Sequence, residues 1–381
     1  MSIQNIAHKT YNEKLLANRY ICNDHITSIL NKLPNLFDVS IIGKSVKQEP
    51  IYAVKIGHGK KRVLLWSQMH GNESTTTKAI FDLFNYLASN HAILNQCTLL
   101  FIPILNPDGA KAYTRTNANL IDLNRDAQNL SQSESITLDK IFKEFKPNFC
   151  FNLHGQRTIF SAGEVNKPAT LSFLAPAEDK ERTVTQTRKV AMEIIAAINN
   201  ELQKIIPGQI GVYDDTFNSN CVGDKYQSLG VPTILFEAGH YYNDYNREET
   251  RKLIFLSLIV SLNEIAENNN LGTNYKAYLE IPENKKLFYD IIIRRVRAIV
   301  NNKEVIVDIA IQYEEVLSGG GIDFIPKVKE IGNLLNHFGH REINAKNGQL
   351  IIPKGVALKV ENSIDCVTIN NVKYSLNLIK S

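Results

Sequence analysis

The sequence predicts an α/β fold with a mixed, mostly parallel, twisted sheet flanked by helices, followed by a small, mainly β C-terminal domain. Continuous apolar runs of strand length indicate strands that are buried on both faces. Segments with helical periodicity lie between these runs, and strands that alternate with helices are typical of a parallel sheet. The sequence changes character near residue 270, where a polar, turn-rich stretch precedes shorter strand-like segments.

A helix and a hairpin are predicted before the core of the sheet. The helical pattern covers about 11–33, and the two hairpin strands cover about 37–43 and 51–57. Because ligands bind at the carboxyl ends of strands in such sheets, residues that follow the core strands are candidates for a functional site. The core strands are predicted at 62–68, 97–105, 149–153 and 232–236, and the helices at 73–88, 136–145, 181–204 and 247–267.

The predicted domain boundary lies near residue 270. Residues 267–274 (ENNNLGTN) are polar and turn-rich, and the later segments alternate polar and apolar residues around a break at 319–321 (GGG). We therefore predict a first domain over 1–270, which includes the N-terminal helix and hairpin. A small, mainly β domain over 271–381 follows, and its size allows it to fold alone.

The composition is that of an ordinary soluble protein of 381 residues with a net charge of +4. No run of Lys and Arg is long enough to follow a phosphate backbone, so nucleic acid is not an expected partner. The five cysteines are scattered and form no C-x-x-C pair, which favours a reducing compartment. We find no leader-like N-terminal stretch and no run of about 18 apolar residues, so we expect a cytoplasmic protein without a membrane span. The oligomeric state stays open.

Three residues near the ends of predicted strands suit a metal ion. His70 and Glu73, in the sequence QMHGNE, lie three positions apart where a strand passes into a helix. A catalytic zinc ion takes three protein ligands and one water, and two histidines with one glutamate form an established ligand set. His154 follows the strand at 149–153 and is the best-placed third ligand among the nine histidines. A lone H-x-x-E arises often by chance, so the prediction of zinc depends on the combination.

Two arginines lie in a polar segment without strong periodicity. Arg115 and Arg125 are ten residues apart, and a guanidinium group suits a carboxylate through paired hydrogen bonds. Taken alone, they would be solvated surface residues. The sequence NPDG at 106–109 precedes them and indicates a turn.

The order of these motifs resembles that of the zinc metallocarboxypeptidases, the carboxypeptidase A-like family, over about residues 40–265. The resemblance implies a metallopeptidase with one Zn²⁺ per chain, which hydrolyses the amide bond at the C-terminal end of a peptide or peptide-like substrate. It also implies the mixed sheet that the pattern predicts. The matching residues are HGNE at 70–73, NPDG at 106–109, Arg115, DLNR at 122–125, His154 and Glu237.

The same resemblance implies the roles of the metal and catalytic residues. His70, Glu73 and His154 would hold zinc, and Asp122 would orient His70. Glu237 would be the general base and acid: zinc lowers the pKa of its bound water, and a nearby carboxylate accepts the proton. Because Glu237 ends an apolar strand, where a carboxylate is costly to bury, a task of this kind is favoured.

The substrate would be bound by residues from three segments. By the resemblance, Asn124 and Arg125 would bind the terminal carboxylate, and Arg115 would polarise the scissile carbonyl. A positive group aimed at a developing oxyanion lowers the barrier by about 3 to 4 kcal/mol. Tyr213 is the candidate, by position, for the tyrosine that closes over the substrate, with Tyr226, Tyr241 and Tyr242 as rivals.

Three alternatives stay open at this point. The sequence EAG at 237–239 also resembles the aspartoacylase and succinylglutamate desuccinylase relatives, for which the substrate would be an N-acyl amino acid. An amidase that acts on cell-wall peptides would use the same residues. A non-enzymatic protein that binds peptide termini would show a broken ligand set or would lack the base. This chain has the complete ligand set and the base.

Overall fold

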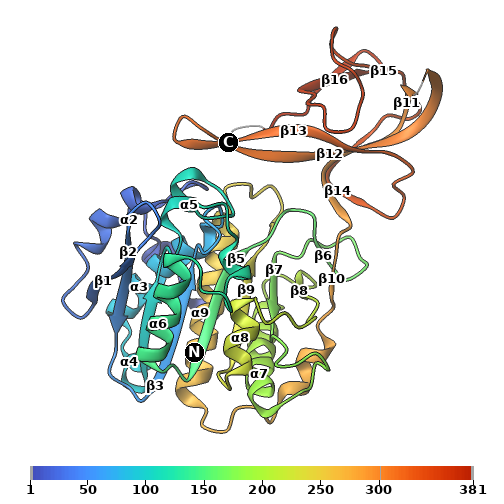
Figure 1. The fold of residues 1–381 in the computed structure, drawn as a ribbon. Helices are drawn as coiled ribbons and strands as arrows, with labels where there is room; N and C mark the ends of the chain where they lie inside the picture. Colours follow the sequence, from blue (N-terminus) through green and yellow to red (C-terminus); the bar gives the residue numbers. More distant parts are fainter. Residues whose placement is uncertain (1–2, 301, 379–381) are drawn as a thin grey trace. The chain divides into compact units, whose positions relative to one another are not determined.

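The computed structural model describes residues 3–300 and 302–378, and the chain divides into two compact units (Figure 1). The first unit comprises Met1–Gln156 and Ala169–Asn284. The second comprises Arg157–Pro168 and Lys285–Ser381. The second unit therefore contains a short segment from the middle of the chain.

This division differs from the predicted boundary near residue 270. The 3-10 helix η3 (Tyr275–Glu280) packs on α7 (Gln186–Leu202) and buries Tyr278, so residues 271–284 belong to the first unit. The polar stretch at 267–274 is thus a turn within that unit. We place the boundary between Asn284 and Lys285.

The first unit is built on an eight-stranded sheet of order β1-β2-β4-β3-β5-β9-β7-β8. Four of its seven neighbouring pairs are parallel, namely β3 with β4, β3 with β5, β5 with β9 and β7 with β8. The prediction of a mixed, mostly parallel sheet is confirmed. The strands are β1 (Asp38–Lys44), β2 (Pro50–Ile56), β3 (Lys61–Ser67), β4 (Cys97–Ile102), β5 (Phe149–Gly155), β7 (Leu171–Leu174), β8 (Ile210–Val212) and β9 (Thr233–Ala238).

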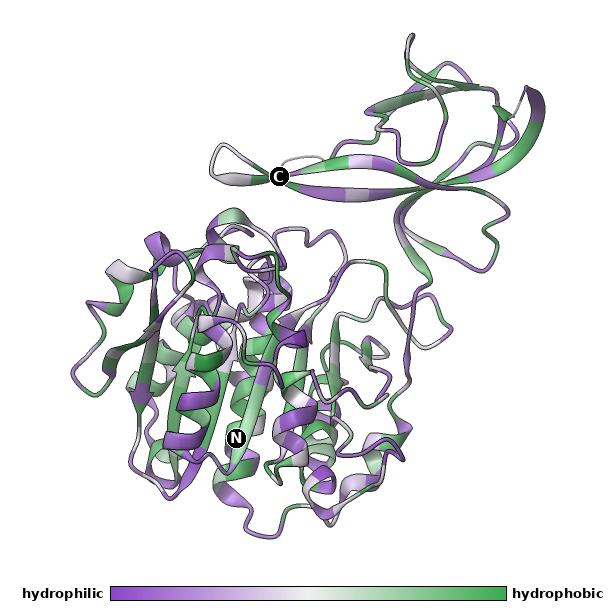
Figure 2. Ribbon diagram, in the orientation of Figure 1, coloured by the Kyte–Doolittle hydropathy of each residue, from purple (hydrophilic) through white to green (hydrophobic). Residues whose placement is uncertain are grey.

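Helices cover both faces of this sheet, as the continuous apolar runs indicate. Along β3, Val63 and Leu65 pack against α3 (Thr75–Ser89), α7 and α9 (Glu248–Glu267). Leu64 and Trp66 point to the other face, which α6 (Ser133–Phe145) and α8 (Val222–Ser228) cover. Figure 2 shows the central strands as predominantly hydrophobic. No helix among the described residues is long and apolar enough to cross a membrane.

The N-terminal region departs from the single helix predicted over 11–33. The structure has α1 (His8–Tyr11) and α2 (Asn23–Leu30), with an irregular stretch between them. Within that stretch Asn18 has a φ of 63°, in the left-handed region that a right-handed helix cannot contain. The remaining short helices of this unit are η1 (Ile3–Asn5), α4 (Ala92–Gln96), α5 (Pro107–Ala112) and η2 (Leu123–Arg125).

The second unit is β-rich, as the sequence predicts. A four-stranded sheet has the order β13-β12-β11-β14, and Gly319 and Gly320, both with positive φ, form the turn between β12 and the edge strand β13. Its own hydrophobic core includes Ile293, Ile309 and Val367. The strands are β6 (Ser161–Ala162), β10 (Asn284–Lys285), β11 (Phe288–Val300), β12 (Lys303–Ser318), β13 (Gly321–Gly332), β14 (Phe338–Asn344), β15 (Leu350–Ile351), β16 (Cys366–Ile369) and β17 (Val372–Ser375).

Candidate metal centre and substrate site

Three neighbouring parallel strands bring the predicted metal and catalytic residues to one edge of the sheet. β3, β5 and β9 lie side by side (Figure 1), so their carboxyl ends meet. His70 follows β3, while His154 and Glu237 lie near the ends of β5 and β9. His154 and Glu237 are paired in register across the two strands, so both side chains project from the same face of the sheet.

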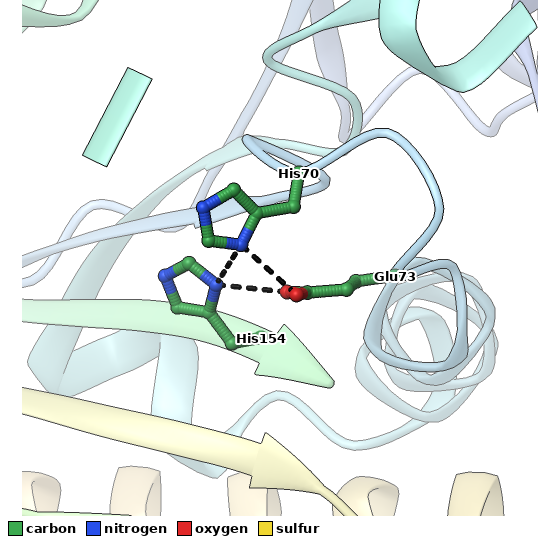
Figure 3. A group of neighbouring side chains, drawn as sticks. All are labelled: His70, Glu73 and His154. Carbon is green, nitrogen blue, oxygen red and sulfur yellow. Dashed lines mark hydrogen bonds and ion pairs between the residues drawn. The ribbon is translucent and has the colours of Figure 1, made fainter. Parts of the chain in front are cut away.

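The side chains of His70, Glu73 and His154 converge on one point (Figure 3). His70 Nδ1 lies 2.9 Å from Glu73 Oε1, and His154 Nδ1 lies 2.8 Å from Glu73 Oε2. The two Nδ1 atoms are 3.1 Å apart, and the ligand atoms of all three residues lie within 4.8 Å of one another. Two imidazole nitrogens and a carboxylate in this arrangement fit a zinc ion.

The protonation of this group also suits a cation. For Glu73, burial is outweighed by the charges of His70 and His154, which hold the pKa of the carboxyl well below its usual range. Burial lowers the pKa of His154. For His70, Glu73 and Asp122 outweigh burial and raise the pKa to about 9. Two Nδ1 atoms at 3.1 Å can share one proton between them, and a metal ion held by these residues would displace that proton.

The loop that carries His70 is held against the NPDG turn. Asn106 Nδ2 donates to Met69 O at 3.1 Å, and Asn106 Oδ1 accepts from Gly109 N at 2.8 Å. A Cβ atom on Gly71 would lie 1.9 Å from the backbone carbon of Gly109. The turn predicted at 106–109 is therefore the N-terminus of α5, and it fixes the chain between the two metal-ligand candidates on the His70 loop.

Asp122 connects the metal group with Arg115. His70 Nε2 lies 3.0 Å from Asp122 Oδ1, the contact that a residue orienting the imidazole must make. Asp122 Oδ2 accepts from Arg115 Nε at 3.0 Å, and an Arg115 Nη atom lies 3.6 Å from Glu73 Oε1. The half-exposed Arg115 side chain is thus positioned beside the metal ligands.

Asn124 and Arg125 lie on η2, opposite the start of α8. Asn124 Oδ1 accepts from Val222 N at 2.9 Å, so this side chain joins the two segments. Arg125 is exposed, and its guanidinium donates to Asn124 O at 2.7 Å and to Cys221 Sγ at 3.1 Å. These two contacts hold the guanidinium of Arg125 in place. The sequence did not indicate the contact with Cys221.

Glu237 and Tyr213 both lie near the metal group. Glu237 Oε2 is buried and has no hydrogen-bond partner among the described residues. Burial, aided by the charge of Glu73, raises the pKa of Glu237 well above its usual range. The Tyr213 hydroxyl donates to Gln156 Oε1 at 2.6 Å, and burial with the nearby charge of Glu237 raises the pKa of Tyr213.

The other tyrosines that the sequence offered are placed differently. Tyr226 is fully buried and stacks on Phe142 with ring centroids 3.9 Å apart. Tyr241 and Tyr242 pack edge to face against each other. Tyr226 therefore belongs to the core beneath α8, while Tyr213 has its hydroxyl close to the end of β5.

A cavity of about 500 Å³ lies in the first unit, beside the group of His70, Glu73 and His154. Asn124, Arg125 and Tyr213 line it together with Asn152 and Asp224, which the sequence analysis did not select. Asn152 could have been noticed as the polar residue within the apolar run at 149–153. Asp224 gave no signal, because its place in the cavity depends on how α8 packs on the sheet.

Comparisons with known proteins agree with the motifs. Residues 22–167 match the Peptidase_M14 family model, described as zinc carboxypeptidase. Carboxypeptidase 2 of Trichophyton rubrum is 30% identical over 113 residues, which are 29% of this chain and 20% of that protein. Gamma-D-glutamyl-L-diamino acid endopeptidase 1 of Lysinibacillus sphaericus is 34% identical over 109 residues, or 24% of this chain and 28% of that protein.

The fold is shared with solved structures. A metallo-carboxypeptidase from Burkholderia cenocepacia matches with a TM-score of 0.50 at 17% identity, over 63% of this chain and 68% of that chain. The sequence match spans about a fifth of the length of the curated carboxypeptidases. The predicted resemblance to zinc carboxypeptidases and the predicted fold are confirmed, whereas the roles of the individual site residues stay predictions.

Proposed function

We propose that this chain, whose residues 22–167 match the zinc carboxypeptidases, is a zinc metallopeptidase that hydrolyses the amide bond at the C-terminal end of peptide or peptide-like substrates. The observation that carries the proposal is the convergence of His70, Glu73 and His154, with Glu237 in register on the adjacent strand. A binding protein without catalysis would not need a base in that position.

The chain's own residues supply the proton transfers. One zinc ion per chain, held by His70, Glu73 and His154, would lower the pKa of a bound water and polarise a carbonyl. Glu237 accepts a proton as the water oxygen bonds to the scissile carbon, and returns a proton to the nitrogen as the C–N bond breaks. The water is thereby divided between a new carboxylic acid and a new amine.

Substrate binding falls to the residues around the cavity. Arg125 and Asn124, which line it, bind the terminal carboxylate, since a guanidinium pairs well with that group. Arg115 is beside Glu73 and stabilises the oxyanion that develops on the scissile carbonyl. Tyr213, which also lines the cavity, adds a hydroxyl donor.

A second candidate substrate class follows from one relative. The endopeptidase of Lysinibacillus sphaericus, 34% identical over 109 residues, is named for the bond between γ-D-glutamate and an L-diamino acid. The same zinc chemistry would cleave that bond, because it is also an amide. A peptide with this linkage is therefore the second substrate to test.

Metal analysis of the purified protein tests the proposal, together with the variants His70→Ala, Glu73→Ala and His154→Ala. We expect one zinc per chain in the wild type and loss of zinc and of activity in each variant. Short peptides, γ-D-glutamyl peptides and N-acyl amino acids form the substrate panel. Cleavage of N-acyl amino acids alone would move the function to an acylase, and a wild-type protein that does not bind zinc would refute the site.

A further inference from the structure

The loop between β3 and α3 carries two of the three proposed metal ligands, His70 and Glu73. Gln68 is the first residue of this loop, and its side chain is completely buried. The backbone of Gln68 has a φ of 45°, in the left-handed region that costs free energy for a residue with a Cβ atom. Such a conformation persists only where the surrounding structure holds it, and it is typical of functional sites.

The side-chain amide of Gln68 joins three separate parts of the first unit. Its Nε2 donates to Gly71 O at 2.8 Å and to Ile21 O at 3.0 Å, and its Oε1 accepts from the Thr77 hydroxyl at 2.7 Å. Because Nε2 has two hydrogens and faces two carbonyl oxygens, the orientation of the amide follows from its partners. Only asparagine and glutamine carry two donors and an acceptor on one planar group.

The two ends of this amide bind the chain on either side of Glu73. Gly71 lies between the two ligands of the loop, and Thr77 lies in the first turn of α3. Glu73 N donates to His70 O at 3.1 Å, so the chain between them forms a tight turn. Because both flanks of this turn are bonded to one buried amide, the direction in which the Glu73 side chain leaves the backbone is fixed.

The third partner of the amide belongs to the irregular N-terminal segment between α1 and α2. Ile21 O accepts from Gln68, and the carbonyl of Arg19 accepts from the hydroxyl of Ser74. Ser74 directly follows Glu73, and its hydroxyl does not cap α3. Two carbonyl groups of the N-terminal segment therefore accept from the two ends of the loop at 68–74.

We propose that Gln68 is a positioning residue for the metal site, whose amide holds His70 and Glu73 in the geometry that binds zinc before the ion arrives. This inference rests on the proposed zinc site and concerns its affinity. A site whose ligands are already in place loses less conformational freedom on binding, so it binds its ion more tightly.

Gln68→Met removes the hydrogen bonds and leaves the shape nearly unchanged. Methionine is similar in length, has no N–H donor, and meets the same cost at positive φ. We expect the zinc dissociation constant, measured by competition with a chelator, to rise by about tenfold or more, as for groups that orient metal ligands. The visible absorption of the cobalt-loaded protein should change as well, because it depends on the geometry of the ligands.

Gln227→Met is the matched control. Gln227 on α8 is also completely buried, its Nε2 donates to Glu178 Oε1 at 3.2 Å, and its Oε1 accepts from Thr233 N at 2.7 Å. We expect this variant to unfold at a lower urea concentration than the wild type, as Gln68→Met does, and to bind zinc like the wild type. A purely structural role of Gln68 would make the two variants alike in both measurements.

Gln68→Gly separates the side chain from the backbone conformation, because glycine adopts a φ of 45° without strain. We expect it to bind zinc as weakly as Gln68→Met, and it carries the test alone if Gln68→Met does not fold. Zinc affinity equal to that of the wild type in either Gln68 variant would overturn the proposal, since the loop would then keep its shape without the amide. A wild-type protein that does not bind zinc would instead refute the zinc site, and the proposed function with it.

Discussion

Glu237 and His154 face the same side of the sheet from adjacent strands, and Glu237 Oε2 is buried without a partner among the described residues. Glutamine has the shape of glutamate and cannot accept the proton of the attacking water. We expect Glu237→Gln to lower kcat by about 10²- to 10⁴-fold, the usual contribution of a general base. Zinc content should stay as in the wild type, because the three proposed ligands are untouched.

The control for this variant is Glu249→Gln, which makes the same change at an exposed position in the first turn of α9. It should retain full activity. Unchanged kcat in Glu237→Gln would show that another group takes the proton.

At the scale of single residues, the sequence predicts those site residues that lie within short motifs. His70 and Glu73 lie within four consecutive residues, and the structure brings His154 to them. Asn152 and Asp224 come from different elements, and nothing local in the sequence shows that they line one cavity. Their place in the cavity lining follows from packing, which a single sequence does not reveal.

At the scale of elements, the close approach of the His70 loop and α5 leads to a prediction for Gly71. Because a Cβ atom there would lie 1.9 Å from the backbone of Gly109, alanine must push the two segments apart. We expect Gly71→Ala to reduce the free energy of unfolding by about 1 to 3 kcal/mol, as overpacking usually does. It should also weaken zinc binding, since His70 and Glu73 flank the displaced residue. Urea unfolding and a zinc titration measure the two effects.

Gly332→Ala is the matched control, because no atom lies within 4 Å of the position of its Cβ. This variant should unfold and bind zinc like the wild type. If Gly71→Ala behaves in the same way, the contact with Gly109 is not needed to hold the metal ligands in place.

The predicted elements agree with the structure where burial gives a clear pattern. The central strands β3, β4, β5 and β9 are covered on both faces, which requires continuous apolar runs. β7 and β8 have four and three residues, too few to show a period, and they were not predicted. The N-terminal helix was predicted too long, because apolar residues of the irregular stretch, such as Leu16 and Ile21, are buried in the core although their chain is not helical.

At the scale of the whole molecule, the chain passes through the second unit twice. Residues 157–168 leave the first unit immediately after Gln156 and join strands from the C-terminal region. A change of composition marks a linker between domains that follow one another in the sequence. It could not show that residues 157–168 belong to the second unit. The predicted cytoplasmic location is a separate matter and stays a prediction.

The segment 157–168 is held mainly by residues that follow it by more than a hundred positions. Phe288 N donates to Ile159 O at 3.1 Å, His340 Nε2 lies 2.7 Å from Thr158 O, and Gln312 Nε2 donates to the Thr158 hydroxyl at 2.6 Å. A chain that ends at residue 284 lacks all three partners. Its segment 157–168 then has little to oppose local unfolding, and local unfolding is the step that exposes a backbone to proteases.

Trypsin measures this directly, because Arg157 is exposed within the segment and is followed by Thr158, whereas trypsin does not cleave the bond between Lys167 and Pro168. In the truncated chain we expect cleavage after Arg157 to be about tenfold faster or more than in the full chain. Cleavage after Lys44, in the hairpin of the first unit, should proceed at the same rate in both chains and serves as the internal control. Equal rates of cleavage after Arg157 would mean that the first unit fixes this segment without its C-terminal partners.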